Sequence, residues 1–129
     1  MEPSIAEGIR LFNAKKFFEA HEALEAVWLQ AQGEEKAFLH GLIQVAAAFH
    51  HFTRGNLTGF QSLLEKGSRK LENSGEARGG IQLAGFLEQL QPWRELARQS
   101  AGQKDSSGPR ETSPSTRAPF PHILPAAAR

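Results

Sequence analysis

The first group of residues able to do chemistry lies in a segment predicted to be helical over residues 16–31. His21 and Glu25 are four residues apart, and Glu22 follows His21 directly. Each helical residue advances by roughly 100°, so His21 falls beside the apolar face that Leu24 marks. Glu25 falls inside the same wide apolar arc. The spacing therefore predicts an imidazole and a carboxylate, one helical turn apart, facing the interior.

A second group lies in the next predicted helix, over residues 34–54. His40, Gln44 and His51 share one narrow face, and Gly41 lies on the same side. Small residues let another helix come close, and the helix over 16–31 is its neighbour in the chain. We therefore expect His21 and Glu25 to face Gln44 and one or both of the two histidines.

Three hypotheses account for this polar cluster. In the first, the side chains form a satisfied hydrogen-bond network that fixes helix register. In the second, His21, Glu25 and His51 bind a divalent metal ion. In the third, Glu22 or Glu25 acts as a general base beside a metal-bound water, as in a metal-dependent hydrolase. The spacing His-Glu-x-x-Glu differs from the zinc-protease pattern and does not by itself indicate a zincin.

The elements that must position these residues are all helical. Apolar residues recur with helical period, and no alternating run predicts a strand. Besides the two helices above, the pattern predicts helices over 3–13, 57–71 and 81–90, and a short last helix that Pro92 begins. Asn13 is expected to stop the first helix, and Gly55 and Asn56 to stop the third and cap the fourth. The fold class is an all-α antiparallel bundle of about five helices.

The domain is expected to span residues 1–99, with the helix over 34–54 at its centre because it is apolar on nearly every side. Residues 100–129 are rich in Pro, Ser and Thr, and we expect a disordered tail. Its Pro-Phe-Pro-His-Ile-Leu-Pro stretch, from Pro119 to Pro125, is a candidate contact for a partner. Spare apolar surface such as Phe86 and Trp93 would allow a homodimer.

Composition narrows the function classes. The chain has no Cys, which excludes disulfides and thiolate metal ligands, and its net charge of +1 gives no reason to expect nucleic-acid binding. Residues 37–52 are too short and too often interrupted by polar residues to span a membrane. The N-terminal residues lack a basic stretch followed by an apolar run, so we expect no signal peptide and a cytoplasmic location.

The run from Phe12 to Trp28, the stretch Phe38–Gln44 and the Gly55-Asn56 pair together resemble the DUF309 family of small bacterial and archaeal helical proteins. The resemblance covers about residues 8–71 and implies a cytosolic multi-helical bundle. It also implies that the family's signature positions are occupied here by His21, Glu22, Glu25, Trp28, Gly41, Gln44 and Asn56. The family often has Gln where this chain has His40.

The sequence therefore predicts a binding or structural domain with a polar pocket between the second and third helices. The residues expected to line the pocket are His21, Glu22, Glu25, Trp28, Gln44, His51 and Asn56. A small ligand or a divalent metal ion would bind there. The alternatives are a metal-dependent hydrolase that uses the same cluster, and a protein-interaction module. Such a module would use either a groove between the first, second and fifth helices or the Pro-rich tail.

Overall fold

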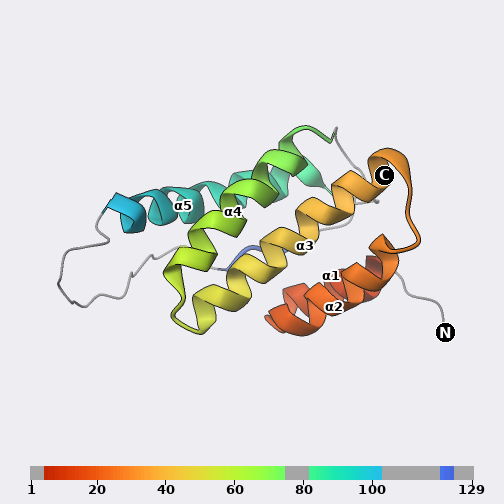
Figure 1. Ribbon diagram of the computed structural model, residues 1–129, viewed down its shortest axis with the longest axis horizontal. Coiled ribbons are helices and arrows are strands. Elements are labelled where there is room, and N and C mark those ends of the chain that lie inside the picture. Colours follow the sequence, from red (N-terminus) through yellow and green to blue (C-terminus); the bar gives the residue numbers. More distant parts are fainter. Residues whose placement is uncertain (1–4, 75–81, 103–119, 124–129) are drawn as a thin grey trace.

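The computed structural model describes residues 5–74, 82–102 and 120–123, and within these ranges the chain forms five α-helices and no strand. The helices are α1 (Ile5–Asn13), α2 (Phe17–Trp28), α3 (Gly33–Thr53), α4 (Leu57–Glu72) and α5 (Leu83–Gly102). Helices that follow one another in the chain pack together, and α3 lies between α2 and α4 (Figure 1). The predicted all-α class is confirmed.

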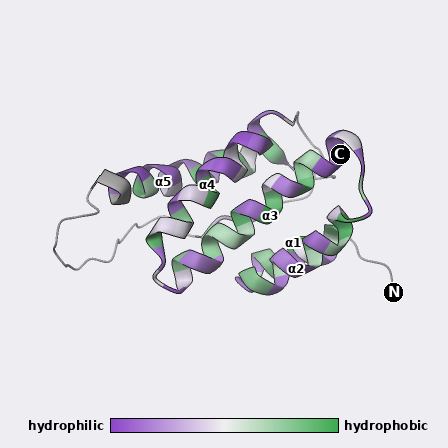
Figure 2. Cartoon of the chain, in the orientation of Figure 1, coloured by the Kyte–Doolittle hydropathy of each residue, from purple (hydrophilic) through white to green (hydrophobic). Residues whose placement is uncertain are grey.

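Helix α3 supplies the centre of the core. Its buried apolar side chains cover most of its circumference, and they are Phe38, Leu39, Leu42, Ile43, Val45, Ala46, Ala48 and Phe49. The other helices have one polar side, and hydrophilic and hydrophobic residues alternate along α4 and α5 (Figure 2). A half-buried stripe of His40, Gln44, Ala47 and His51 remains on α3. No helix of the described residues is long and apolar enough to cross a bilayer.

The helix ends follow local backbone chemistry. Gly33 and Gly55 adopt φ values of 64° and 81°, in the left-handed region that glycine favours. After α1, however, the left-handed residue is Lys15, with a φ of 66°, and not the expected Asn13, which is still helical. The Lys16 N–H then donates to the Leu11 carbonyl at 2.9 Å. This turn leaves the Asn13 side chain free for another contact.

Helix α5 differs from the prediction at Pro92. The structure has one continuous helix from Leu83 to Gly102 with Pro92 inside it, where the sequence suggested that Pro92 starts a new helix. A proline removes one helical hydrogen bond. The helix continues because buried side chains on both sides of Pro92 lie on one stripe, namely Phe86, Leu90, Trp93 and Ala97. The helix also continues past residue 99, the expected boundary of the domain.

Four residues of the expected tail pack against the helices. Phe120, Pro121 and Ile123 are half-buried or buried, and Ile123 is only 1% exposed. Figure 1 shows this segment, in blue, alongside α3. Burial of the apolar side chains at both ends of the segment offsets the conformational entropy lost when so short a stretch is ordered. The rest of the expected tail (103–119 and 124–129), the expected start of the first helix at Pro3 and most of the glycine-rich loop after Ser74 lie outside the described residues.

Helices α3 and α4 cross at two glycines. A Cβ atom added at Gly67 would lie 2.8 Å from the Gly41 carbonyl oxygen and 2.9 Å from the Val45 Cγ2 atom. A Cβ atom at Gly41 would in turn lie 3.0 Å from the Leu71 side chain. Gly41 therefore allows α4 to approach α3 closely, whereas the sequence suggested that α2 would approach at this position.

We expect Gly67→Ala to lower the free energy of unfolding by about 1–3 kcal/mol, because the added methyl group separates two backbones that touch. Gly85→Ala is the matched control, since a Cβ atom there meets nothing closer than Gln82 Oε1 at 3.8 Å. It should raise stability by up to about 1 kcal/mol through helix propensity. Urea denaturation measures both changes. Equal effects of the two substitutions would contradict the close crossing.

Candidate functional site

The polar residues predicted on α2 do not form a buried row. His21 is half-buried, and its Nδ1 atom is buried without a hydrogen-bond partner among the described residues. Glu22 and Glu25 are both exposed. The buried face of α2 is narrower than the apolar arc suggested, because only Phe17, Ala20 and Leu24 are fully enclosed. Glu25 lies beyond its edge, and Trp28 is half-buried.

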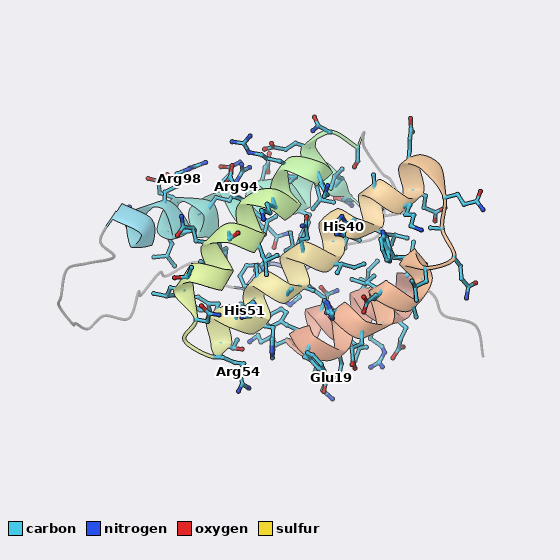
Figure 3. The ribbon with its side chains drawn as sticks, viewed as in Figure 1. Glu19, His40, His51, Arg54, Arg94 and Arg98 are labelled. Carbon is cyan, nitrogen blue, oxygen red and sulfur yellow. The ribbon has the colours of Figure 1, made fainter. Side chains whose placement is uncertain are left out.

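The polar residues of α3 face different neighbours. A Cβ atom at Gly67 of α4 would lie 3.0 Å from the Gln44 Cβ atom, so Gln44 lies against α4. The His51 Nδ1 atom is 3.1 Å from the Asn56 Nδ2 atom, at the start of α4. The His40 ring lies 5.7 Å from the Trp28 ring of α2. Figure 3 shows His40 and His51 well apart along α3, as expected for a rise of about 16 Å over eleven residues.

The candidate metal ligands are therefore not assembled. Glu25 is exposed on α2, whereas His51 lies over the start of α4. In residues 5–74, 82–102 and 120–123, no group of three or more His, Asp or Glu side chains is arranged to hold a metal ion. Glu22, the candidate general base, is exposed. The metal and hydrolase hypotheses thus have no ligand set in this part of the chain.

Asn56 caps a helix. Its Oδ1 atom accepts a hydrogen bond from the Gly59 N–H at 3.0 Å, which satisfies one of the free N–H groups at the start of α4. Its exposed side chain also contacts His51. This expected pocket residue thus has a local role in the turn between α3 and α4.

Histidines gather where α2 begins and α3 ends. The exposed Phe18 ring lies 6.1 Å from the His21 ring and 5.2 Å from the His50 ring. Partial burial lowers the pKa of His50, and the charges of Arg54, His51 and His21 lower it further. At the other end of α2, Trp28 contacts two residues of α3: its ring lies 5.7 Å from the His40 ring, and the Lys36 Nζ atom is 4.6 Å from the indole centroid.

A different set of residues makes the most complete binding arrangement, and it holds residues 120–123. We call it the segment site and define it by Asn13, Lys15, Phe17, Phe49, Phe52, Gln89 and Trp93. Phe120 is its central occupant: its ring stacks on the Trp93 ring at 5.2 Å and an interplanar angle of 16°. The rings of Phe17 and Phe49 lie 5.5 and 5.9 Å from the Phe120 ring.

Two side-chain amides bind the backbone of the segment. Gln89 of α5 donates to the His122 carbonyl at 3.0 Å and accepts from the His122 N–H at 2.9 Å. Asn13 of α1 donates to the Ile123 carbonyl at 3.0 Å and accepts from the Ile123 N–H at 2.8 Å. In an extended chain, successive residues point their N–H and C=O groups to opposite edges. The two amides therefore bind the two edges of one extended segment.

The segment site also overturns one expectation about dimerisation. Phe86 and Trp93, proposed as spare apolar surface, are 1% and 2% exposed. Phe12 packs against Phe86 at 5.6 Å between ring centroids, and Phe120 packs against Trp93. The sequence indicates the stretch from Pro119 to Pro125 as a candidate contact for a partner, within a tail that is expected to be disordered. Nothing in the sequence indicated that Asn13 or Gln89 would bind the main chain of the tail, since isolated polar residues at helix surfaces are common.

A buried arginine holds α5 against α4. Helix α5 carries Gln89 and Trp93 of the segment site, so this contact helps to position them. Arg94, next to Trp93, is 6% exposed and donates to Glu72 at 2.6 Å and to Glu65 at 3.2 Å. Hydrogen bonds from Arg69, and then from Arg94, lower the pKa of Glu65 despite its partial burial. Beside Arg94 is a hollow of about 370 Å³ between the two helices, and Figure 3 shows Arg94 and Arg98 side by side on α5.

The fold and the segment site together define a small all-α domain with an extended segment docked on it. Residues 5–63 match the family model described as "Domain of unknown function (DUF309)", and the resemblance seen in the sequence is confirmed over these residues. An "Uncharacterized protein" of Aquifex aeolicus (strain VF5) is 32% identical over 89 residues. These make up 66% of this chain and 27% of that protein, so the chain spans about a quarter of the relative's length.

The pKa of His40 is lowered, first by partial burial and second by the charge of Lys70. Proton binding by His40 therefore favours the unfolded chain. The stability tied to neutral His40 is complete above pH 6.5, the ordinary pKa, and is lost as the pH falls through 6.5 toward the folded-state pKa.

We expect Lys70→Met to raise the pKa of His40 in a histidine NMR titration, because it removes the second of the two causes. Lys66→Met, which removes an exposed lysine of the same helix, is the control and should leave that pKa unchanged. In urea denaturation, His40→Gln should reduce the loss of stability between pH 7.5 and pH 5.5. An unaltered His40 titration in Lys70→Met would contradict the assigned cause.

Proposed function

We propose that this chain is a non-enzymatic protein-interaction module whose segment site binds an extended peptide. The observation that carries the proposal is the pair of amides, Asn13 and Gln89, each of which makes two hydrogen bonds to the main chain of the segment. Backbone groups that leave water need partners. Outside a sheet, an asparagine or glutamine amide is a side chain that can donate and accept at the same time.

The site binds the main chain and the side chains of the segment through different residues, and this supports the proposed function. Hydrogen bonds to the main chain do not depend on which side chains the segment carries, so they supply affinity without selecting a sequence. Selection comes from two apolar anchors, Phe120 among the aromatic rings and the buried Ile123. Extended peptides are recognised in the same way elsewhere, through main-chain hydrogen bonds combined with pockets for alternate side chains.

Two features of the cluster predicted from the sequence favour binding over catalysis. The acids that a hydrolase would need, Glu22 and Glu25, are exposed. The unpartnered atoms there, His21 Nδ1 and Gln44 Oε1, belong to side chains that face different neighbours. In the segment site, in contrast, the amides of Asn13 and Gln89 each use both a donor and an acceptor in hydrogen bonds to the segment.

We expect Asn13→Ala and Gln89→Ala each to speed hydrogen exchange at the His122 and Ile123 amides by about fivefold or more. A hydrogen bond contributes about 1 kcal/mol, and its loss raises the open fraction of the segment accordingly. Gln91→Ala, an exposed glutamine two residues from Gln89, is the matched control and should change nothing. Exchange of the two amides at the rate of an unstructured peptide in the unaltered chain would refute the proposal.

A further inference from the structure

We infer that the segment site accepts a segment from another protein, and that Phe120–Ile123 compete with it from within the same chain. This inference rests on the proposed function, because it needs the site to bind peptides. The partner segment is extended and carries an aromatic residue, a proline, a residue of any type and a branched aliphatic residue. An acidic residue precedes the aromatic one.

The requirement for each position follows from its contacts. The first position is aromatic because Phe120 stacks on Trp93 and lies under the Lys15 ammonium, 5.5 Å from the ring centroid. The second position suits proline, since Pro121 is buried and has no N–H group to leave unpaired. The third is unrestricted because the His122 side chain is exposed, and the fourth is aliphatic because Ile123 is enclosed.

The acidic residue follows from the charge around the entry to the site. Lys15 and Lys16 are both exposed at the turn between α1 and α2, and Lys15 reaches the Phe120 ring. In the sequence of this chain, Arg117 comes three residues before Phe120, and residues 112–119 include no acid. The chain's own sequence therefore offers no acid to this basic entry. A partner with an acid at that position gains an attraction that the internal segment lacks.

The internal segment is a competitor that a partner must outbind. Residues 103–119 join α5 to Phe120, and a covalent connection of this length corresponds to an effective concentration in the millimolar range. A second copy of this chain would offer the same four residues at micromolar concentration and with no better contacts. A partner segment succeeds because it makes a contact that the internal segment does not.

The test compares full-length variants with two labelled peptides in fluorescence anisotropy. Phe120→Ala/Ile123→Ala removes both internal anchors and frees the site. The first peptide has the sequence of residues 116–127, and the second carries Arg117→Glu. We expect the freed variant to bind the first peptide at least tenfold more tightly than the unaltered chain does. It should bind the Glu peptide about threefold more tightly again, and added salt should remove that difference.

Three controls make the result specific. Full-length His122→Ala should behave as the unaltered chain, because that side chain touches solvent. A peptide with Phe120→Ala should not bind. Adding Asn13→Ala to the freed variant should weaken binding of the first peptide by about tenfold. Circular dichroism shows whether the freed variant is folded; if it is not, Phe120→Leu, which keeps an apolar anchor without the stacked ring, replaces it and should show a smaller gain in affinity.

Each other outcome overturns the inference. Equal binding to the unaltered and freed chains would mean that the internal segment does not compete. If the freed chain binds neither peptide while His122 and Ile123 are still protected from exchange in the unaltered chain, the site binds only its own segment. The proposed docking would then stand without a partner. A dimer in sedimentation that disappears in the freed variant would assign the site to a second copy.

Discussion

A helix that is apolar around most of its circumference must be covered on every side, and this requirement on α3 organises the molecule. Helix α2 covers one flank and α4 the other, and the two glycines at positions 41 and 67 let α4 approach closely. Toward the end of α3, the rings of Phe49 and Phe52 meet Trp93 of α5. Phe120 fills the remaining aromatic surface. The docked segment therefore completes the core that α3 begins.

Helix periodicity predicted the fold but could not predict which neighbour each face meets. Gly33 and Gly55 mark real helix boundaries because their left-handed conformation is encoded locally. Helix α3 touches both α2 and α4, however, and angular spacing alone does not tell which of the two a given residue contacts. Gly41 and Gln44 were assigned to α2 on the ground of adjacency, and both lie against α4. Glu25 was placed inside because the arc of apolar residues on α2 is wider than its buried face.

The segment site shows a second limit of sequence interpretation. The composition of residues 100–129 is unfavourable for folding as a whole, and an average over a long stretch hides a four-residue anchor. The amides that bind this anchor lie far from it in the chain: Asn13 is 110 residues from Ile123, and Gln89 is 33 residues from His122. Side chains at such separations have no shared local pattern. The DUF309 match includes Asn13, Phe17 and Phe49, while α5 and the docked segment lie outside it.

The order in which a ribosome makes this chain gives the docked segment a consequence in time. All five helices precede Phe120 in the sequence. At roughly 5–20 residues per second, the stretch from Gly102 to Ile123 takes about 1–4 s to synthesise. The aromatic rings of α3 and α5 are therefore made before the Phe120 ring that covers them. The side chains that form the segment site are thus all made before the residues that occupy it.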